Sequence, residues 1–197
     1  MDASHTPFVA GRLAFVEQCL AAAAAQPLAD GFPGAGREVK IFKMGDDPIM
    51  VHKINIDGLA PEDYRTFTEN YLAVVLELTA ADRKQVNYTE VEKDANGKAI
   101  IHQWMDPNVM FVSARSMIVQ QYSVSQTEGH IFFLSSKDSA ELEKKYASKI
   151  GKDVIGTLEV NYWHFKPNGS GTSITHVVCS KPNGSLPDMA VKKMSTK

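Results

Sequence analysis

The fold is decided by the stretch TSITHVVCSKPNGSLP, residues 172–187. Its first half alternates apolar and polar residues, and this period of two predicts a β-strand over 172–179. Residues 181–187 then bring two prolines and a glycine close together, which predicts a turn. The pattern restarts as a helix over 188–194. A last strand that hands over to a helix lying across its sheet would enclose a pocket.

The helix predicted after this turn is short. About ten residues follow Pro187, which corresponds to ~15 Å at helical rise. That is little for covering the face of a sheet. Three explanations are open. The chain ends early and leaves a more open pocket, the chain has been cut short, or a neighbouring chain completes the cover.

Working outward, the sequence predicts an N-terminal helix within 1–26, with Thr6 as N-cap and Pro7 as the first helical residue. A linker rich in glycine and proline follows over 27–36. The remaining core, 37–197, shows helical periodicity over 61–81 and 139–150 and strand patterns over 39–42, 50–56, 85–92, 99–105, 111–125, 129–135, 157–165 and 172–179. This order predicts an α+β fold, a curved antiparallel sheet wrapped around helices, in one domain spanning 1–197.

Composition excludes several classes of function. The chain has 197 residues, of which 44% are hydrophobic, and a net charge of −2, so no basic footprint for nucleic acid exists. No signal peptide or membrane span is evident, and we expect a cytoplasmic protein in which Cys19 and Cys179 are buried, reduced thiols. The sequence contains none of the common hydrolase, zinc-protease, dithiol or phosphate-loop motifs. We therefore expect no catalytic residue, no metal and no cofactor.

Three short motifs resemble the START lipid-transfer domain of the helix-grip superfamily, which includes the Bet v 1 type. KPNGSLP at 181–187 looks like the turn before that family's C-terminal helix, FVSAR at 111–115 looks like one of its strands, and MDP at 105–107 looks like its proline-containing loop. The resemblance covers roughly 8–195. The chain departs from the family where Val109, Met110, Lys181 and Met189 replace its usual Arg-Asp pair, acidic residue and aromatic residue.

The resemblance implies a curved antiparallel sheet that grips a C-terminal helix around an apolar cavity. It also implies binding, and probable transfer, of a single sterol, phospholipid or other apolar ligand. The loop around 106–108 or the C-terminal helix would act as the gate. An enzyme of the same superfamily, with Tyr162, His164 or His176 as acid or base, and a lipid-sensing regulatory module are the alternatives.

Arg115 is the first candidate for a polar contact with such a ligand. It lies on the same side of the predicted strand as Phe111, Met117 and Val119. Its side chain therefore points inward if that side of the strand faces the interior. A guanidinium there binds phosphate or carboxylate. A buried or edge ion pair that orders the sheet is at least as well supported.

Polar aromatic side chains mark the last two predicted strands. Tyr162 and His164 share one face of their strand and Trp163 and Phe165 the other, so both faces are apolar enough to be covered. His164 and His176, on adjacent strands, have the chemistry to bind metal or relay protons. A third ligand is missing, and histidines satisfied by their neighbours are the favoured interpretation.

An apolar cavity also needs large and adaptable walls. Methionine adapts to flexible chains, although most such residues in any protein belong to the ordinary core. The predicted ligand contacts are Trp104, Met105, Met110, Arg115, Met117, Phe133, Tyr162, His164, His176 and Met189.

Lysines in two groups are candidates for transient contact with an anionic membrane surface. A solvated charged face is the more usual explanation and is favoured for the first group, 144–152. The second group is Lys192, Lys193 and Lys197. The predicted partners are thus a lipid ligand and a membrane surface.

Overall fold

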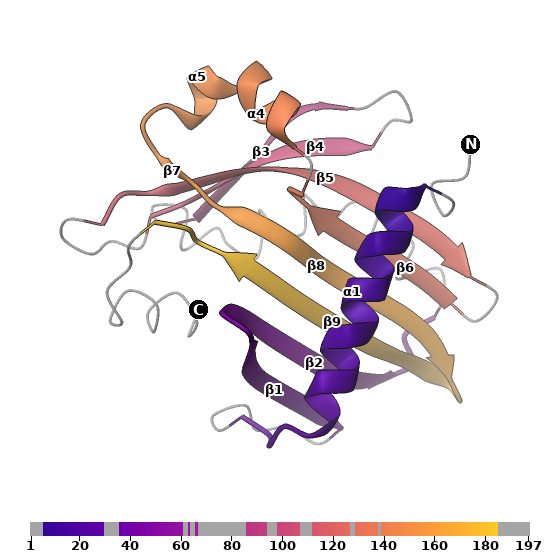
Figure 1. Cartoon of the computed structure of the whole chain (residues 1–197). Coiled ribbons are helices and arrows are strands. Elements are labelled where there is room, and N and C mark those ends of the chain that lie inside the picture. The colour runs from indigo at the N-terminus through magenta and orange to yellow at the C-terminus, as the bar shows by residue number, and fades with distance from the viewer. Residues whose placement is uncertain are drawn as a thin grey trace. The chain divides into compact units, whose positions relative to one another are not determined.

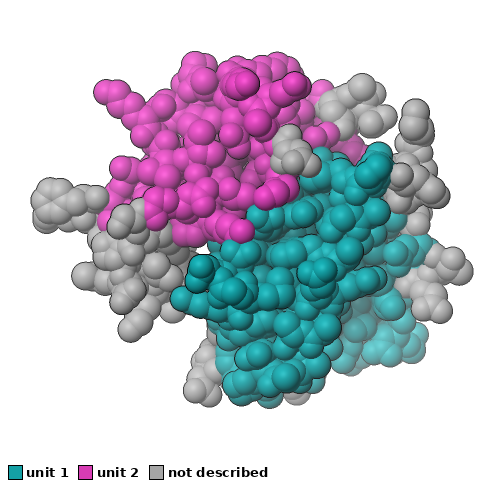
Figure 2. Space-filling model, in the orientation of Figure 1, with its two compact units in different colours: residues 1–70, 121–135, 159–180 teal, residues 71–120, 136–158, 181–197 magenta. Residues whose placement is uncertain are grey.

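The structure is a computed structural model in which residues 6–29, 36–60, 63, 66, 86–93, 98–106, 112–126, 129–137 and 139–184 are described. The chain divides into two compact units (Figure 2). Unit 1 comprises residues 1–70, 121–135 and 159–180, and unit 2 comprises 71–120, 136–158 and 181–197. The prediction of one domain over 1–197 stays a prediction.

The strands join in a sheet whose order is β1-β2-β9-β8-β6-β5-β4-β3, with β7 beside β5 (Figure 1). Neighbours β1–β2, β2–β9, β6–β8, β4–β5 and β3–β4 pair antiparallel, while β7 runs parallel to β5. The bounds are β1 Arg37–Met44, β2 Asp47–Asp57, β3 Val86–Lys93, β4 Ala99–Met105, β5 Arg115–Gln126, β6 Gly129–Ser135, β7 Val154–Ile155, β8 Thr157–Asn168 and β9 Gly171–Lys181. The predicted antiparallel sheet is confirmed.

Most predicted elements lie within a few residues of the observed ones. The strand predicted over 111–125 begins only at Arg115, since Val112–Ala114 are not in regular structure. The helix predicted over 139–150 is wrong as one element, because it is divided into α4 (Ala140–Lys145) and α5 (Ala147–Ile150). Strand β7 was not predicted. The helical pattern over 188–194, and nearly all of that over 61–81, lies outside the described residues.

Helix α1 (Pro7–Ala24) confirms the predicted start of the N-terminal helix. Oγ1 of Thr6 accepts a hydrogen bond from the N–H of Val9 at 3.3 Å, which satisfies one of the helix's unpaired amides. At the other end, Nζ of Lys40 in β1 donates to the carbonyl oxygen of Ala23 at 2.8 Å. A cation is favourable there because the helix dipole is negative at its C-terminus.

The hydrophobic core of unit 1 lies between α1 and the strands that it crosses (Figure 1). Side chains of one parity on each strand meet the helix, and in β2 and β9 the register places Val51 opposite Val177. Cys19 and Cys179 are both buried in this core and form no disulfide with each other, as predicted. The buried core residues are Val9, Val16, Cys19, Ala23, Ile49, Val51, Val124, Ile131, Phe133, Val160, Tyr162, Val177 and Cys179.

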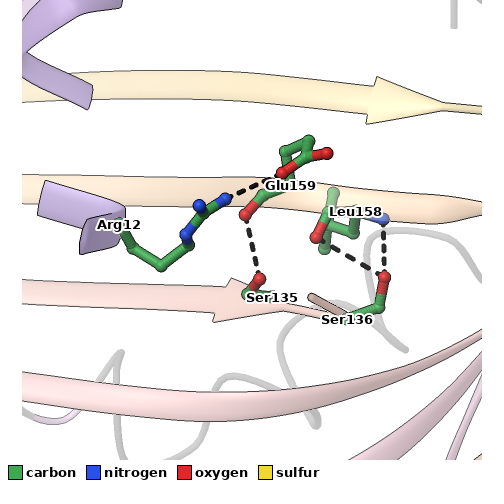
Figure 3. Close-up of polar contacts among 5 residues, drawn as sticks. All are labelled: Arg12, Ser135, Ser136, Leu158 and Glu159. Atoms are coloured by element: carbon green, nitrogen blue, oxygen red, sulfur yellow. Dashed lines mark hydrogen bonds and ion pairs between the residues drawn. The ribbon is translucent and has the colours of Figure 1, made fainter. Parts of the chain in front are cut away.

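One ion pair ties α1 to the sheet at the edge of this core (Figure 3). Nη1 of Arg12 lies 2.7 Å from Oε2 of Glu159, and only 18% and 7% of the two side chains are exposed. Oγ of Ser135 donates to the carbonyl oxygen of Glu159 at 2.9 Å. The Arg12 guanidinium also lies over the rings of Phe8 and Phe15. Shielded from water on several sides, this pair is a structural anchor of the helix.

Unit 2 has a smaller core of Ile100, Ile118 and Ile150, against which Leu142 and Tyr146 pack. In the same unit, Oγ of Ser136 accepts from the N–H of Leu158 at 2.7 Å (Figure 3). None of the described helices is long and apolar enough to cross a bilayer.

Candidate ligand-binding site

The face of β2, β9 and β8 turned away from α1 carries a pocket of about 320 Å³ in unit 1. Among the described residues its walls are mostly apolar, with two histidines toward one end and Asp63 toward the other. A volume of this size falls at the lower end of the range for small-molecule sites. The lining residues are His52, Ile54, Ile56, Leu59, Asp63, Trp163, Phe165, Ile174 and His176.

Strand alternation explains why these residues share a wall. Successive side chains of a strand point to opposite faces. Ile49 and Val51 therefore join the core against α1, while His52, Ile54 and Ile56 face the pocket. The register of β2 with β9 continues the wall across the sheet, since it pairs His52 with His176 and Ile54 with Ile174.

His176 is fixed in place by two neighbours on β8. Its Nε2 lies 2.8 Å from Oδ1 of Asn161, and its ring stacks on Trp163, with 4.6 Å between centroids and 7° between planes. Since the amide oxygen only accepts, Nε2 carries the proton. Burial, followed by the charge of His52, lowers the pKa of His176 to about 3. The ring is therefore neutral at pH 7, and Nδ1 is an acceptor.

His52 is held in the opposite tautomer. Nε of Arg37 donates to Nε2 of His52 at 2.9 Å, so Nε2 is unprotonated and the proton lies on Nδ1. Burial, and then the positive charge of Arg37, lowers the pKa of His52. The rings of His52 and His176 lie 6.4 Å apart, centroid to centroid. The pair therefore offers one donor and one acceptor.

The other end of the pocket is closed by the segment that follows β2. Oγ1 of Thr172 donates to the carbonyl oxygen of Leu59 at 2.7 Å, which fixes the segment over the end of β9. Oδ2 of Asp63 accepts from the N–H of Ala60 at 2.8 Å. This hydrogen bond holds the carboxylate of Asp63 beside the pocket wall.

Of the predicted ligand contacts that the structure describes, only His176 lines this pocket. Phe133 and Tyr162, paired across β6 and β8, lie in the core against α1, and Phe133 stacks on Tyr122 with centroids 4.8 Å apart. Burial raises the pKa of Tyr162, and the negative charge of Glu17 adds to the shift.

His164 follows Tyr162 at the same parity on β8, and their rings are 6.3 Å apart. Its Nε2 is buried and has no hydrogen-bond partner in the part of the chain that the structure describes. Burial, Lys166 and His130 lower its pKa to about 4. The imidazole of His164 is therefore neutral at pH 7, since burial disfavours the charged form.

Arg115 begins β5 in unit 2 and is 1% exposed. Its guanidinium donates to the carbonyl oxygens of Ser113, Pro182 and Asn183, the last two at 3.2 Å. These contacts tie the start of β5 to the turn that ends β9. Arg115 therefore orders the sheet through hydrogen bonds to carbonyl oxygens, and the described residues show no sign of the ion pair considered for it.

The other predicted contacts in unit 2 do not gather around a described pocket. Trp104 and Met105 are half-buried in β4, while Met117 is buried in β5, with its side chain against Gly156. Met110 and Met189 lie outside the described residues.

A serine, a histidine and a carboxylate also meet in unit 2. Oγ of Ser116 donates to Oδ2 of Asp153 at 2.7 Å and lies 3.0 Å from Nε2 of His102. In a hydrolase the histidine stands between the serine and the acid, but here the serine stands in the middle. Ser116 is fully buried, so this cluster cross-links strands and does not activate a nucleophile. The described residues contain no group of three or more metal-ligating side chains.

Most residues of the pocket were not predicted as ligand contacts, among them Ile54, Trp163, Phe165 and Ile174. Alternation correctly grouped Trp163 with Phe165, and Ile174 with His176. It gave no sign of which face α1 covers, because both faces are apolar.

The described part of the chain is an α+β protein in which an antiparallel sheet has a helix on one face and an apolar pocket on the other. Solved structures have a similar fold: the chain has the START fold, as the sequence motifs indicated. Human STARD10 matches with a TM-score of 0.62 and 15% identity over 97% of this chain and 74% of its own. Human StAR-related lipid transfer protein 5 matches with 0.62 and 12% over 96% and 89%.

A bacterial protein is similar as well. The STAR-related lipid transfer protein of Xanthomonas axonopodis matches with a TM-score of 0.58 and 13% identity, over 87% of this chain and 89% of its own. No protein-family model and no curated protein matches the sequence. Identities this low establish the fold alone.

Proposed function

We propose that the chain binds one apolar, lipid-like ligand at a time in the pocket over β2, β9 and β8, and carries it between membranes. The observation behind this proposal is the apolar wall of Ile54, Ile174, Trp163 and Phe165 on the face of the sheet turned away from α1. Burial of each ligand methylene there contributes about 0.8 kcal/mol. The names of the similar structures, which refer to lipid transfer, support the same function.

The proposal includes two expectations that concern residues outside the pocket. Exchange of ligand needs a gate, which we place at the loop around 106–108 or at the C-terminal segment. We also expect a cytoplasmic protein with transient contact to a membrane surface. The lysines of α4 and α5 and those near the C-terminus are the candidates for that contact.

A binding role fits the ionisable side chains better than catalysis does. An acid or base needs a pKa near neutrality to act at pH 7. Burial raises the pKa of Tyr162, and lowers that of His164 to about 4 and that of His176 to about 3. We therefore expect the protein to show no turnover that depends on these three residues. A lipid-sensing module would differ from a carrier only in that a filled pocket changes the binding of a partner protein.

Two measurements test the carrier function. Native mass spectrometry of the purified protein should detect one apolar ligand per chain, and the protein should speed the transfer of a fluorescent lipid between vesicles. The variant Ile54→Arg places a charge in the pocket and should abolish both results. Lys53→Gln, at the neighbouring position on the other face of β2, is the matched control and should change neither. Absence of ligand and of transfer in the unmodified protein refutes the function.

A further inference from the structure

The polar end of the pocket is built for a particular kind of chemical group. Two lining side chains form it, His52 from β2 and His176 from β9. Arg37 from β1 binds His52, and Asn161 from β8 binds His176. Contacts with Arg37 and Asn161 engage Nε2 of both imidazoles and set both tautomers. Nδ1 of each ring has no hydrogen bond to another described residue, and neither Nδ1 is among the buried atoms without a partner.

We infer that the ligand ends in a neutral hydroxyl group, which accepts a hydrogen bond from Nδ1 of His52 and donates one to Nδ1 of His176. This inference rests on the proposed binding function and names the chemical class of its ligand. An apolar alcohol places its chain or ring system along Ile54, Ile174 and Phe165 and its oxygen between the two histidines.

The hydrogen-bonding capacity of the pair supports this assignment. A hydroxyl group has one donor and two acceptor sites, so it satisfies the donor of His52 and the acceptor of His176 together. The ring centroids lie 6.4 Å apart, which leaves room for one oxygen between the two rings at hydrogen-bond distance, about 2.8 Å, from a nitrogen of each. An ether lacks the donor, and a carboxylate or phosphate directs only lone pairs at the unprotonated Nδ1 of His176.

Charges around the pocket argue in the same direction. The carboxylate of Asp63 lies at the opposite end, where it disfavours an anionic ligand. Arg37 is exposed and its Nε is already bound to His52, so its charge is largely screened by water. An anionic head placed against the rim beside Arg37 is the rival arrangement, and the test below separates the two.

Four probes with the same chain isolate the head group: dodecanol, dodecyl methyl ether, dodecanoate and dodecyl phosphate. Binding to the purified full chain, stripped of co-purifying ligand, is measured by titration calorimetry at pH 7. Because a neutral hydrogen bond contributes about 0.5–1.5 kcal/mol, dodecanol should bind about 3- to 10-fold more tightly than the ether. Both anions should bind more weakly than the alcohol.

Variants then assign the preference to the histidines. His176→Phe keeps a flat ring on Trp163 and removes the acceptor, and His52→Phe removes the donor. His176→Phe should reduce the alcohol-to-ether ratio to about one and leave the affinity for the ether nearly unchanged. His52→Phe removes the donor from which both oxygens accept, so it should weaken the alcohol and the ether alike and keep the ratio. Thr175→Val, at the next position of β9 on the other face, should keep the full ratio. A thermal melt of each variant shows that it is folded.

The outcomes distinguish the two levels of inference. If the four probes bind equally, or an anion binds best, the hydroxyl assignment is wrong while the binding function stands. A preference for alcohol that survives in His176→Phe also overturns the assignment. If none of the probes binds, the proposed function fails, and this inference fails with it.

Discussion

Acidification should destabilise the protein through His176, and the size of the effect follows from its surroundings. The pKa of this histidine is about 3 in the folded chain against about 6.5 when unfolded. Between these values the unfolded state binds the extra proton, so stability is present above pH 6.5 and is lost as the pH falls toward 3. At pH 5, 1.5 pH units below the unfolded pKa, the loss from His176 is about 2 kcal/mol at 1.36 kcal/mol per unit.

The groups that face His176 define the experiment. They are Asn161, which holds Nε2, and His52 with its partner Arg37. Urea unfolding followed by circular dichroism, at pH 7 and pH 5, gives the loss for the unmodified chain. In His176→Phe this loss should be smaller by about 2 kcal/mol. Comparing each protein with itself removes the cost of the substitution.

Thr175→Val is the control, because it alters β9 without removing a titrating group, and it should keep the whole loss. His52 and His164 also have lowered pKa values, so part of the acid sensitivity should remain in His176→Phe. An equal loss in His176→Phe and the unmodified chain would show that the pKa of His176 is the same in the folded and unfolded chain. The argument that burial lowers this pKa would then be refuted.

Three further predictions concern stability. Glu159→Gln leaves the shielded guanidinium of Arg12 without its anion and should reduce the free energy of unfolding by about 3 kcal/mol. Glu92→Gln, in an exposed pair with Lys145, is the control and should change it little. Equal effects of the two variants in urea titrations would contradict this. Arg115→Met removes three donors to carbonyl oxygens and should cost about 3 kcal/mol, with partial recovery in Arg115→Lys; an unchanged urea midpoint would count against it. Gly171→Ala would place a Cβ atom 2.2 Å from the carbonyl oxygen of Ile56 and should lower the melting temperature. Gly11→Ala, with open space around it in α1, should raise the melting temperature. An unchanged melting temperature in Gly171→Ala would mean that β2 and β9 separate easily at this position.

Local sequence signals predicted the elements well where a cap or a turn marks the boundary. Thr6 and Pro7 located the start of α1 to the residue, and the alternation after Gly171 located β9. Local sequence signals did not predict elements that depend on contacts with distant parts of the chain. Strand β7 has two residues and exists because it pairs with β5, and α4 ends at Lys145, within a continuous helical pattern.

The site was harder to predict than the fold for a specific reason. Periodicity separates Tyr162 and His164 from Trp163 and Phe165, but it does not show which set faces α1. The Arg12–Glu159 pair, joining residues far apart in the sequence, is one of the contacts that hold α1 on its face. Likewise, no pattern in β1 shows that Arg37 reaches His52 and fixes its tautomer.

Side chains on the two faces of β2 and β9 are under different evolutionary constraints. Val51 and Val177 are constrained by the packing of a helix, whereas His52 and His176, one position away, face the pocket. A substitution at one parity changes how firmly the protein folds, and a substitution at the other changes what it binds. Ligand preference in this chain is therefore free to diverge along the same strands that keep its architecture constant.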